Sequence, residues 1–175
     1  MNKKLTFVAG FLLVGLLGIN FSLKDAYAVE GPIITSSFAQ KELRPGDILK
    51  VYLKASSADS SMKAIYVILE QTGGGVYPVS ITRIKGDQQK ELSGYLYLST
   101  HTTVGSSSDF VPLKLTAQIQ DSKGRFSEPV VFPVLFRPRV SPENPPAGVF
   151  AEKELGPIMI RLRPFLDGGG NPSFE

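Results

Sequence analysis

Residues 48–55 read Ile48-Leu49-Lys50-Val51-Tyr52-Leu53-Lys54-Ala55. Leucine, valine and alanine alternate here with lysine and tyrosine, and successive side chains of an extended chain point to opposite faces. This two-residue period predicts a β-strand with one face in a core and the other in water. The preceding residues 44–47, Arg-Pro-Gly-Asp, predict a turn, because proline fixes φ and glycine accepts a positive φ.

Further segments of the same character follow between residues 31 and 137, separated by turn residues. They are residues 33–38, 64–70, 76–84, 92–98, 111–119 and 129–136. Pro78 favours a sheet edge or a bulge for its segment. No stretch keeps a helical period, and about seven short strands with frequent turns predict a single antiparallel β-sandwich in an all-β chain. The side chains expected to face inward are Val51, Leu53, Leu96, Leu113, Leu115 and Ile119.

The first residues have the pattern of an export signal. A basic start, Met1 to Lys4, precedes an apolar run from Leu5 to Phe21, and the segment ends Ala26-Tyr27-Ala28. This predicts a signal peptide over residues 1–28 that is cleaved after Ala28. A retained membrane anchor is the alternative, because about 17 apolar residues approach the length that spans a bilayer.

Composition narrows the classes of function. The chain has 175 residues, with 19 Lys+Arg and 16 Asp+Glu; cleavage removes three basic and one acidic residue and leaves a net charge of +1. No basic stripe is present, so we do not expect nucleic acid as a partner. The absence of cysteine excludes disulfides, thiol nucleophiles and a lipidated cysteine. A lysine-containing leader on a chain without cysteine indicates a bacterial exported protein, periplasmic or extracellular.

Two turn motifs carry a resemblance to a known class of module. The Pro45-Gly46-Asp47 turn opens an alternating strand, and residues 118–127, Gln-Ile-Gln-Asp-Ser-Lys-Gly-Arg-Phe-Ser, contain a D-x-x-G-x-x-S turn. Both resemble the bacterial Ig-like or fibronectin-III-like β-sandwich modules of exported proteins. The resemblance spans residues 31–137 and implies an Ig-like topology. The chain departs from antibody domains because it lacks the paired cysteines and the packed tryptophan.

After the sandwich, which we place at residues 29–137, the composition changes. Residues 138–150 contain four prolines and predict an extended linker. Residues 151–166 contain one more short strand, at residues 155–164, and residues 167–175 predict a disordered tail. We expect the added strand to fold back onto its own sandwich, because the tether raises its effective concentration there. Strand addition to another subunit or partner is the alternative.

The candidate chemical sites are weak, and we expect no enzyme, no cofactor and no metal. His101 lies in a loop with Ser106, Ser107 and Asp109, but no nucleophile elbow or oxyanion hole is indicated. The acidic residues are scattered, and a small sandwich offers no cleft in which two carboxyl groups would flank a sugar. The loop of residues 55–61 offers a calcium ion a single carboxylate, Asp59, where several are usual.

Tyrosines and the C-terminal isoleucines form the candidate interaction surface. Tyr52, Tyr95 and Tyr97 fall on the polar side of their strands, and exposed aromatic rings can anchor a protein or stack on a sugar. Ile158 and Ile160 belong to the extra strand. We therefore expect an exported, non-catalytic module that binds another exported or envelope protein or serves in envelope structure. A carbohydrate-binding module is the alternative, and membrane contact is expected only if the signal peptide is retained.

Overall fold

The computed structural model describes residues 31–59, 61–72, 77–101 and 112–162, and its regular secondary structure is almost entirely β-strand. The strands are β1 (Ile33–Ala39), β2 (Glu42–Leu43), β3 (Ile48–Ser56), β4 (Met62–Gln71), β5 (Ser80–Arg83), β6 (Glu91–Ser99), β7 (Leu113–Asp121), β8 (Val130–Phe136) and β9 (Glu154–Pro157), with one 3₁₀ turn, η1 (Gly86–Gln88). The predicted signal peptide and the predicted tail lie outside the described residues.

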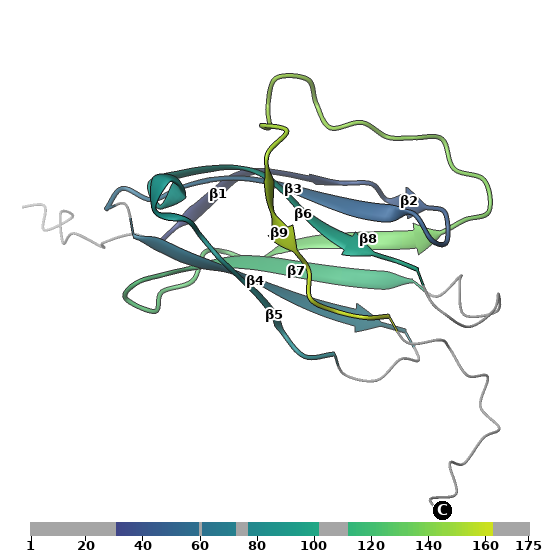
Figure 1. The fold of residues 1–175 in the computed structure, drawn as a ribbon, viewed down its shortest axis with the longest axis horizontal. Coiled ribbons are helices and arrows are strands. Elements are labelled where there is room, and N and C mark those ends of the chain that lie inside the picture. The colour runs from purple at the N-terminus through teal and green to yellow at the C-terminus, as the bar shows by residue number, and fades with distance from the viewer. Residues whose placement is uncertain (1–30, 60, 73–76, 102–111, 163–175) are drawn as a thin grey trace, which may run out of the picture.

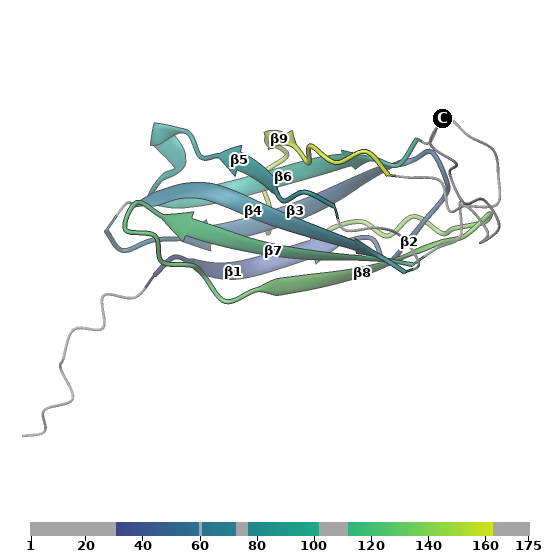
Figure 2. The ribbon, with the colours of Figure 1, turned by 90° about the horizontal axis from the view of Figure 1, so that it is seen from below.

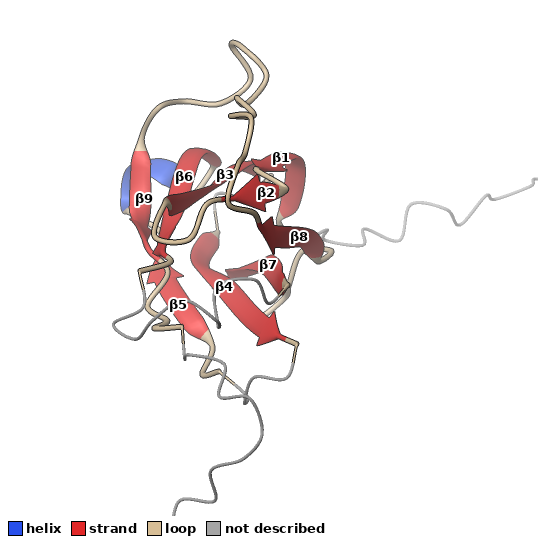
Figure 3. Cartoon of the chain, turned by 90° about the vertical axis from the view of Figure 1, so that its right-hand side faces the viewer, coloured by secondary structure: helices blue, strands red, loops and turns tan. Residues whose placement is uncertain are grey.

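The strands form two sheets that lie face to face. Sheet I has the order β1-β3-β6-β9, and sheet II has the order β2-β8-β7-β4-β5. Figure 1 and Figure 2 show the two sheets as layers of one body, and Figure 3 shows the layers viewed along the strands. The predicted all-β sandwich is confirmed at this level, because two sheets enclose one shared core.

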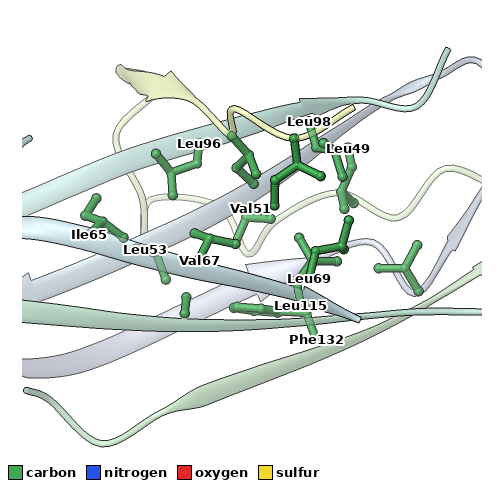
Figure 4. Close-up of a cluster of buried hydrophobic side chains, with 14 of the residues drawn as sticks. Leu49, Val51, Leu53, Ile65, Val67, Leu69, Leu96, Leu98, Leu115 and Phe132 are labelled. Atoms are coloured by element: carbon green, nitrogen blue, oxygen red, sulfur yellow. The ribbon is translucent and has the colours of Figure 1, made fainter. Parts of the chain in front are cut away.

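The core lies between the inner faces of the sheets. Leu49, Val51 and Leu53 of sheet I face β4 and β7 of sheet II in Figure 4, where all the sticks drawn are apolar side chains. The prediction of inward-facing residues is confirmed, since each is at most 2% exposed: Val51, Leu53, Leu96, Leu113, Leu115 and Ile119. The two-residue period therefore identified the buried face of β3, β6 and β7 correctly.

The sheets are not wholly antiparallel, which corrects the expectation. Five neighbouring pairs of strands are antiparallel, but β2 pairs with β8 and β9 pairs with β6 in parallel. Strand β2 is a two-residue segment that the sequence did not predict. Its pairing rests on two bonds, from Leu135 N to Lys41 O (2.8 Å) and from Arg137 N to Leu43 O (2.9 Å). The chain thus crosses from sheet I to sheet II between β1 and β2.

The C-terminal strand is shorter than the predicted residues 155–164 and pairs within its own chain. It joins β6 over Glu154 to Pro157, with an irregular register. Beyond Pro157 the chain continues along the side of the sandwich, where Ile158, Ile160 and Leu162 are 4%, 7% and 5% exposed. These residues enter the same core as the main strands.

A substitution pair on β7 tests the assignment of its two faces. Replacing buried Leu115 by Ala should lower the free energy of unfolding by about 2–5 kcal/mol, because it leaves a cavity in the core. Replacing Lys114 by Ala should change it by less than about 1 kcal/mol, because its ion pair with Glu70 (2.9 Å) lies in solvent. Urea denaturation of both variants measures the difference, and a larger loss for Lys114→Ala would contradict the assignment.

Candidate functional site

The three tyrosines of the predicted surface gather on the outer face of sheet I. Tyr52 on β3 and Tyr95 on β6 are cross-strand partners with ring centroids 5.4 Å apart. Tyr97 lies two residues further along β6, opposite Lys50. The Nζ atom of Lys50 lies 4.2 Å from the centroid of the Tyr95 ring, within cation–π range. The strand register therefore places all three tyrosines together.

Tyr52 is nevertheless covered, which corrects the expectation that it is exposed. Only 4% of it is exposed, because the Phe150 ring lies over it with centroids 5.5 Å apart. Its hydroxyl donates to the Glu152 carboxylate at 3.1 Å. Burial, together with this hydrogen bond, raises the pKa of Tyr52. Tyr95 and Tyr97 stay half-buried, so only part of the expected aromatic surface faces solvent.

Ile158 and Ile160 also lie inside the sandwich instead of on its surface. Their side chains point into the gap between β6 and β5 and join the core cluster. A two-residue period in a C-terminal strand indicates one apolar face, but it does not say which groove receives that face. In this structure the groove belongs to the same chain, so neither isoleucine offers a free contact.

The positions of the described residues do not add support for a catalytic site or a metal site. His101 is exposed at the end of a described segment, while Ser106, Ser107 and Asp109 lie outside the described residues. Within the described ranges no three His, Cys, Asp or Glu side chains gather where they could hold a metal ion.

The calcium candidate, Asp59, is occupied by the protein's own donors. One carboxylate oxygen accepts hydrogen bonds from Ser57 Oγ (2.7 Å) and from Ser61 Oγ. The other accepts from Lys123 Nζ and Arg125 Nη2, both at 3.1 Å. The hydrogen bonds from Ser61 and Ser57, followed by that from Lys123, hold the pKa of Asp59 well below its usual range. The loop therefore stabilises a carboxylate without a metal.

The hairpin between β7 and β8 depends on a second, fully buried carboxylate. Asp121 Oδ1 accepts from the backbone N–H groups of Lys123 (2.9 Å) and Arg125 (2.8 Å), while Oδ2 accepts from Arg125 Nε at 2.6 Å. Burial acts to raise the pKa of Asp121, but the donors from Arg125 and Lys123 outweigh it and the pKa lies below its ordinary value. Gly124, the glycine of the D-x-x-G motif, takes φ +83° at the tip, a conformation that glycine adopts without steric cost.

The outer face of sheet II carries an exposed apolar surface that the sequence analysis missed. We call it the apolar face and define it as Ile68, Ile81, Phe126, Val131 and Leu135. These side chains are 39%, 52%, 45%, 48% and 37% exposed. The signal was present, because the β8 sequence, Val-Val-Phe-Pro-Val-Leu-Phe, is apolar at every position. Such a run is usually interpreted as a strand buried on both faces.

The strand register places these side chains on one face of sheet II, on both sides of β7. Ile68 on β4 and Val131 on β8 are both paired with Thr116 on β7. Ile81 on β5 is paired with Tyr66 on β4. The Tyr66 ring meets the Phe126 ring edge-on with centroids 5.1 Å apart. Thr116 therefore separates Ile68 from Val131, and the apolar side chains form two groups, one on either side of the polar outer face of β7.

A hollow adjoins the apolar face at the edge of β8. Its volume is about 390 Å³, and its lining includes Phe38 and Ala39 of β1 together with Val131 and Pro133 of β8. Lys41 and Glu143 also line it. Pro133 has no N–H group, which limits pairing of a further strand along this edge. The hollow therefore borders the apolar face at Val131.

No protein-family model matches the chain. No curated protein matches it either. Among the described residues, no helix is both long and apolar enough to cross a membrane. Functional inference therefore depends on the site geometry.

The Asp121 carboxylate should make stability depend on acid. Because its pKa is lower in the folded than in the unfolded chain, its contribution is present above the ordinary Asp pKa and disappears as the pH falls through the folded value. Asp121→Asn should cost about 1–3 kcal/mol at pH 7 through its lost hydrogen bonds and weaken the acid dependence of the melting temperature. Asp87→Asn, at an exposed ion pair, is the control. Equal acid profiles for wild type and Asp121→Asn would contradict this.

Proposed function

We propose that the chain is an exported, non-catalytic β-sandwich module that binds another protein through the apolar face of sheet II. The observation that carries the proposal is the set of large, exposed apolar side chains on this outer face, which lie on both sides of β7. Soluble monomers seldom gather such side chains on one exposed face unless the surface has a partner. The chemistry of the partner follows: it should present an apolar, weakly charged surface.

The charges around the apolar face support a protein partner. One charged pair on this face, Glu70 and Lys114, forms an ion pair of 2.9 Å, and Arg83 is exposed on β5 two residues from Ile81. Thr116 and Gln118 of β7 lie between the two apolar groups and supply polar side chains without charge. Interface centres are depleted in charge and keep a polar rim, so this distribution suits an interface better than a purely solvated surface.

The strand order supports an Ig-like topology for the module. Constant-type immunoglobulin sandwiches place strands A, B, E and D in one sheet and C, F and G in the other. Strands β1, β3 and β6 take the order of A, B and E, and β4, β7 and β8 take that of C, F and G. The position of D beside E is filled by β9, which comes from the C-terminus and runs parallel to β6.

The carbohydrate alternative has a smaller aromatic platform than expected, with Tyr97 half-buried. A sugar would stack on exposed rings, and Tyr52 is covered by Phe150 and Glu152. Tyr95 is approached by Lys50 at 4.2 Å from its ring centroid, which occupies the ring face that a sugar needs. Protein binding through sheet II is therefore the preferred function.

Photo-crosslinking from the apolar face tests the proposal. A photoreactive phenylalanine analogue at Val131 of the full chain, produced in an exporting bacterial host, should form an adduct with one envelope protein. The same analogue at Lys54, which is exposed on sheet I, is the matched control and should not form that adduct. Adding Ile81→Glu should abolish the Val131 adduct without lowering the melting temperature, because Ile81 is half exposed. An adduct that survives Ile81→Glu, or that forms equally from position 54, would overturn the proposal.

The proposal that the protein is exported depends on residues 1–28, which have the basic start, the apolar run and the Ala-x-Ala ending of a signal peptide. The processed protein should begin at Val29. N-terminal sequencing and intact mass of the protein from the periplasm or the medium measure this. Replacing Ala28 by a bulky residue should retain the leader, because the cleavage site requires small side chains. A membrane-bound product that keeps Met1 would show that the segment is an anchor.

A further inference from the structure

The segment from Glu154 to Leu162 closes the side of the sandwich between β6 and β5. Ile158, Ile160 and Leu162 are buried in the core, whereas Met159 between the two isoleucines is 72% exposed. Every second side chain therefore fills the gap between the two sheets. Figure 3 shows β9 beside β6 and the chain continuing toward β5. The segment acts as a complementing strand that the rest of the sandwich lacks.

Backbone hydrogen bonds tie this segment to both sheets. On the sheet I side, Tyr95 N donates to Lys153 O at 2.9 Å and Ile158 N donates to Tyr97 O at 2.8 Å. On the sheet II side, Met159 N donates to Ser80 Oγ at 2.8 Å. Backbone recognition combined with alternate apolar side chains is how sheets accept an added strand.

Gly94 in β6 forms a notch for the docked segment. A Cβ atom at this position would overlap the carbonyl oxygen of Lys153 and would lie 2.9 Å from Leu155 Cδ2. Glycine within a strand interior costs stability, so its place here is explained by the close approach of another backbone. The groove is thus shaped to accept the segment and can be blocked by one side chain.

The tether that leads to the segment lies largely free of the body. From Pro138 to Gly148 no residue is buried, and four of the positions are proline. The tether forms an arch away from the two sheets in Figure 1 and Figure 3. It reverses direction at a turn in which Val149 N donates to Pro146 O at 3.3 Å and Gly148 takes φ +73°. Docking of the segment onto its own sandwich therefore depends on this turn.

We propose that residues 150–162 are an exchangeable strand, and that two copies of the chain dock each other's segment to form a reciprocal dimer. The closed monomer and the reciprocal dimer contain the same contacts between segment and groove. They differ only at the turn around Gly148. Residues 138–149 span about 37 Å when extended, which is enough to reach a neighbouring copy. A flexible tether gives an effective concentration in the millimolar range, so the closed monomer prevails at micromolar concentration while the turn is intact. Opening the turn shifts the population to the dimer.

Gly148→Val tests the hinge in the full chain. A β-branched residue at this positive φ is strained, whereas the groove and the docking segment are unchanged. The variant should elute as a dimer in size-exclusion chromatography with light scattering. Gly46→Val is the matched control, because Gly46 also has a positive φ (+86°) with no atom within 4 Å of an added Cβ. The control should lose stability but remain monomeric. A monomeric Gly148→Val variant would overturn the proposal.

A complementation experiment tests the exchange directly. Gly94→Val blocks the groove but leaves the donor segment intact, and Ile158→Asp with Ile160→Asp disables the donor but leaves the groove intact. Each chain alone should have a lowered melting temperature. Mixing the two should produce a one-to-one heterodimer with a raised melting temperature. A synthetic peptide of residues 150–162, added to the Ile158→Asp/Ile160→Asp chain, reports whether the groove is folded.

Each contrary outcome is informative. If the peptide raises the melting temperature but mixing gives no heterodimer, the groove accepts a strand that the tether cannot deliver to another chain, and the exchange is excluded. If neither peptide nor partner chain binds, the segment is not transferable and the proposal is equally wrong. The crosslinking test of the apolar face is read from Val131 on β8, which does not pair with the docked segment, so its failure is distinguishable from failure of the exchange.

Discussion

A two-layer core must be covered on every side, and in this protein the side between β6 and β5 is covered by the C-terminal segment. Strands β3, β6, β4 and β7 bring their apolar faces together, and in the described part of the chain the strand that pairs with β6 on the side away from β3 is the C-terminal β9. Ile158, Ile160 and Leu162 cover that opening and connect the two sheets. Stability of the sandwich therefore depends on residues that follow a proline-rich tether, far from the strands that they support.

This constraint also accounts for the altered tyrosine surface. To reach the groove, the chain must cross the outer face of sheet I, and it does so with Phe150 and Glu152 packed on Tyr52. The ion pair between Lys153 and Asp87 (3.1 Å) is exposed and contributes little by comparison. Cover of Tyr52 is thus a consequence of how the segment enters, and it removes part of the aromatic surface of sheet I from solvent.

The sequence predicted those features that depend on neighbouring residues. The alternation in residues 48–55 and 113–119 is local, and it identified strands and buried faces without knowledge of partners. Strand β2 could not be predicted, because two residues carry no period and its pairing depends on Leu135 and Arg137. The cover of Tyr52 depends on a residue 100 positions away. The apolar face was not predicted, because an all-apolar β8 is equally compatible with burial on both of its faces.

Strand β5 connects the two surfaces on which function is proposed. The Thr82 hydroxyl lies toward the docked segment and donates to Pro157 O at 3.4 Å, while the neighbouring Ile81 is 52% exposed on the apolar face. Successive side chains of a strand point to opposite sides, so one short edge strand serves both. Because β5 has only β4 as a strand neighbour, the docked segment supplies much of its remaining support. Release of the segment would therefore loosen the edge of the apolar face, whereas Val131 and Leu135 on β8 would keep their places.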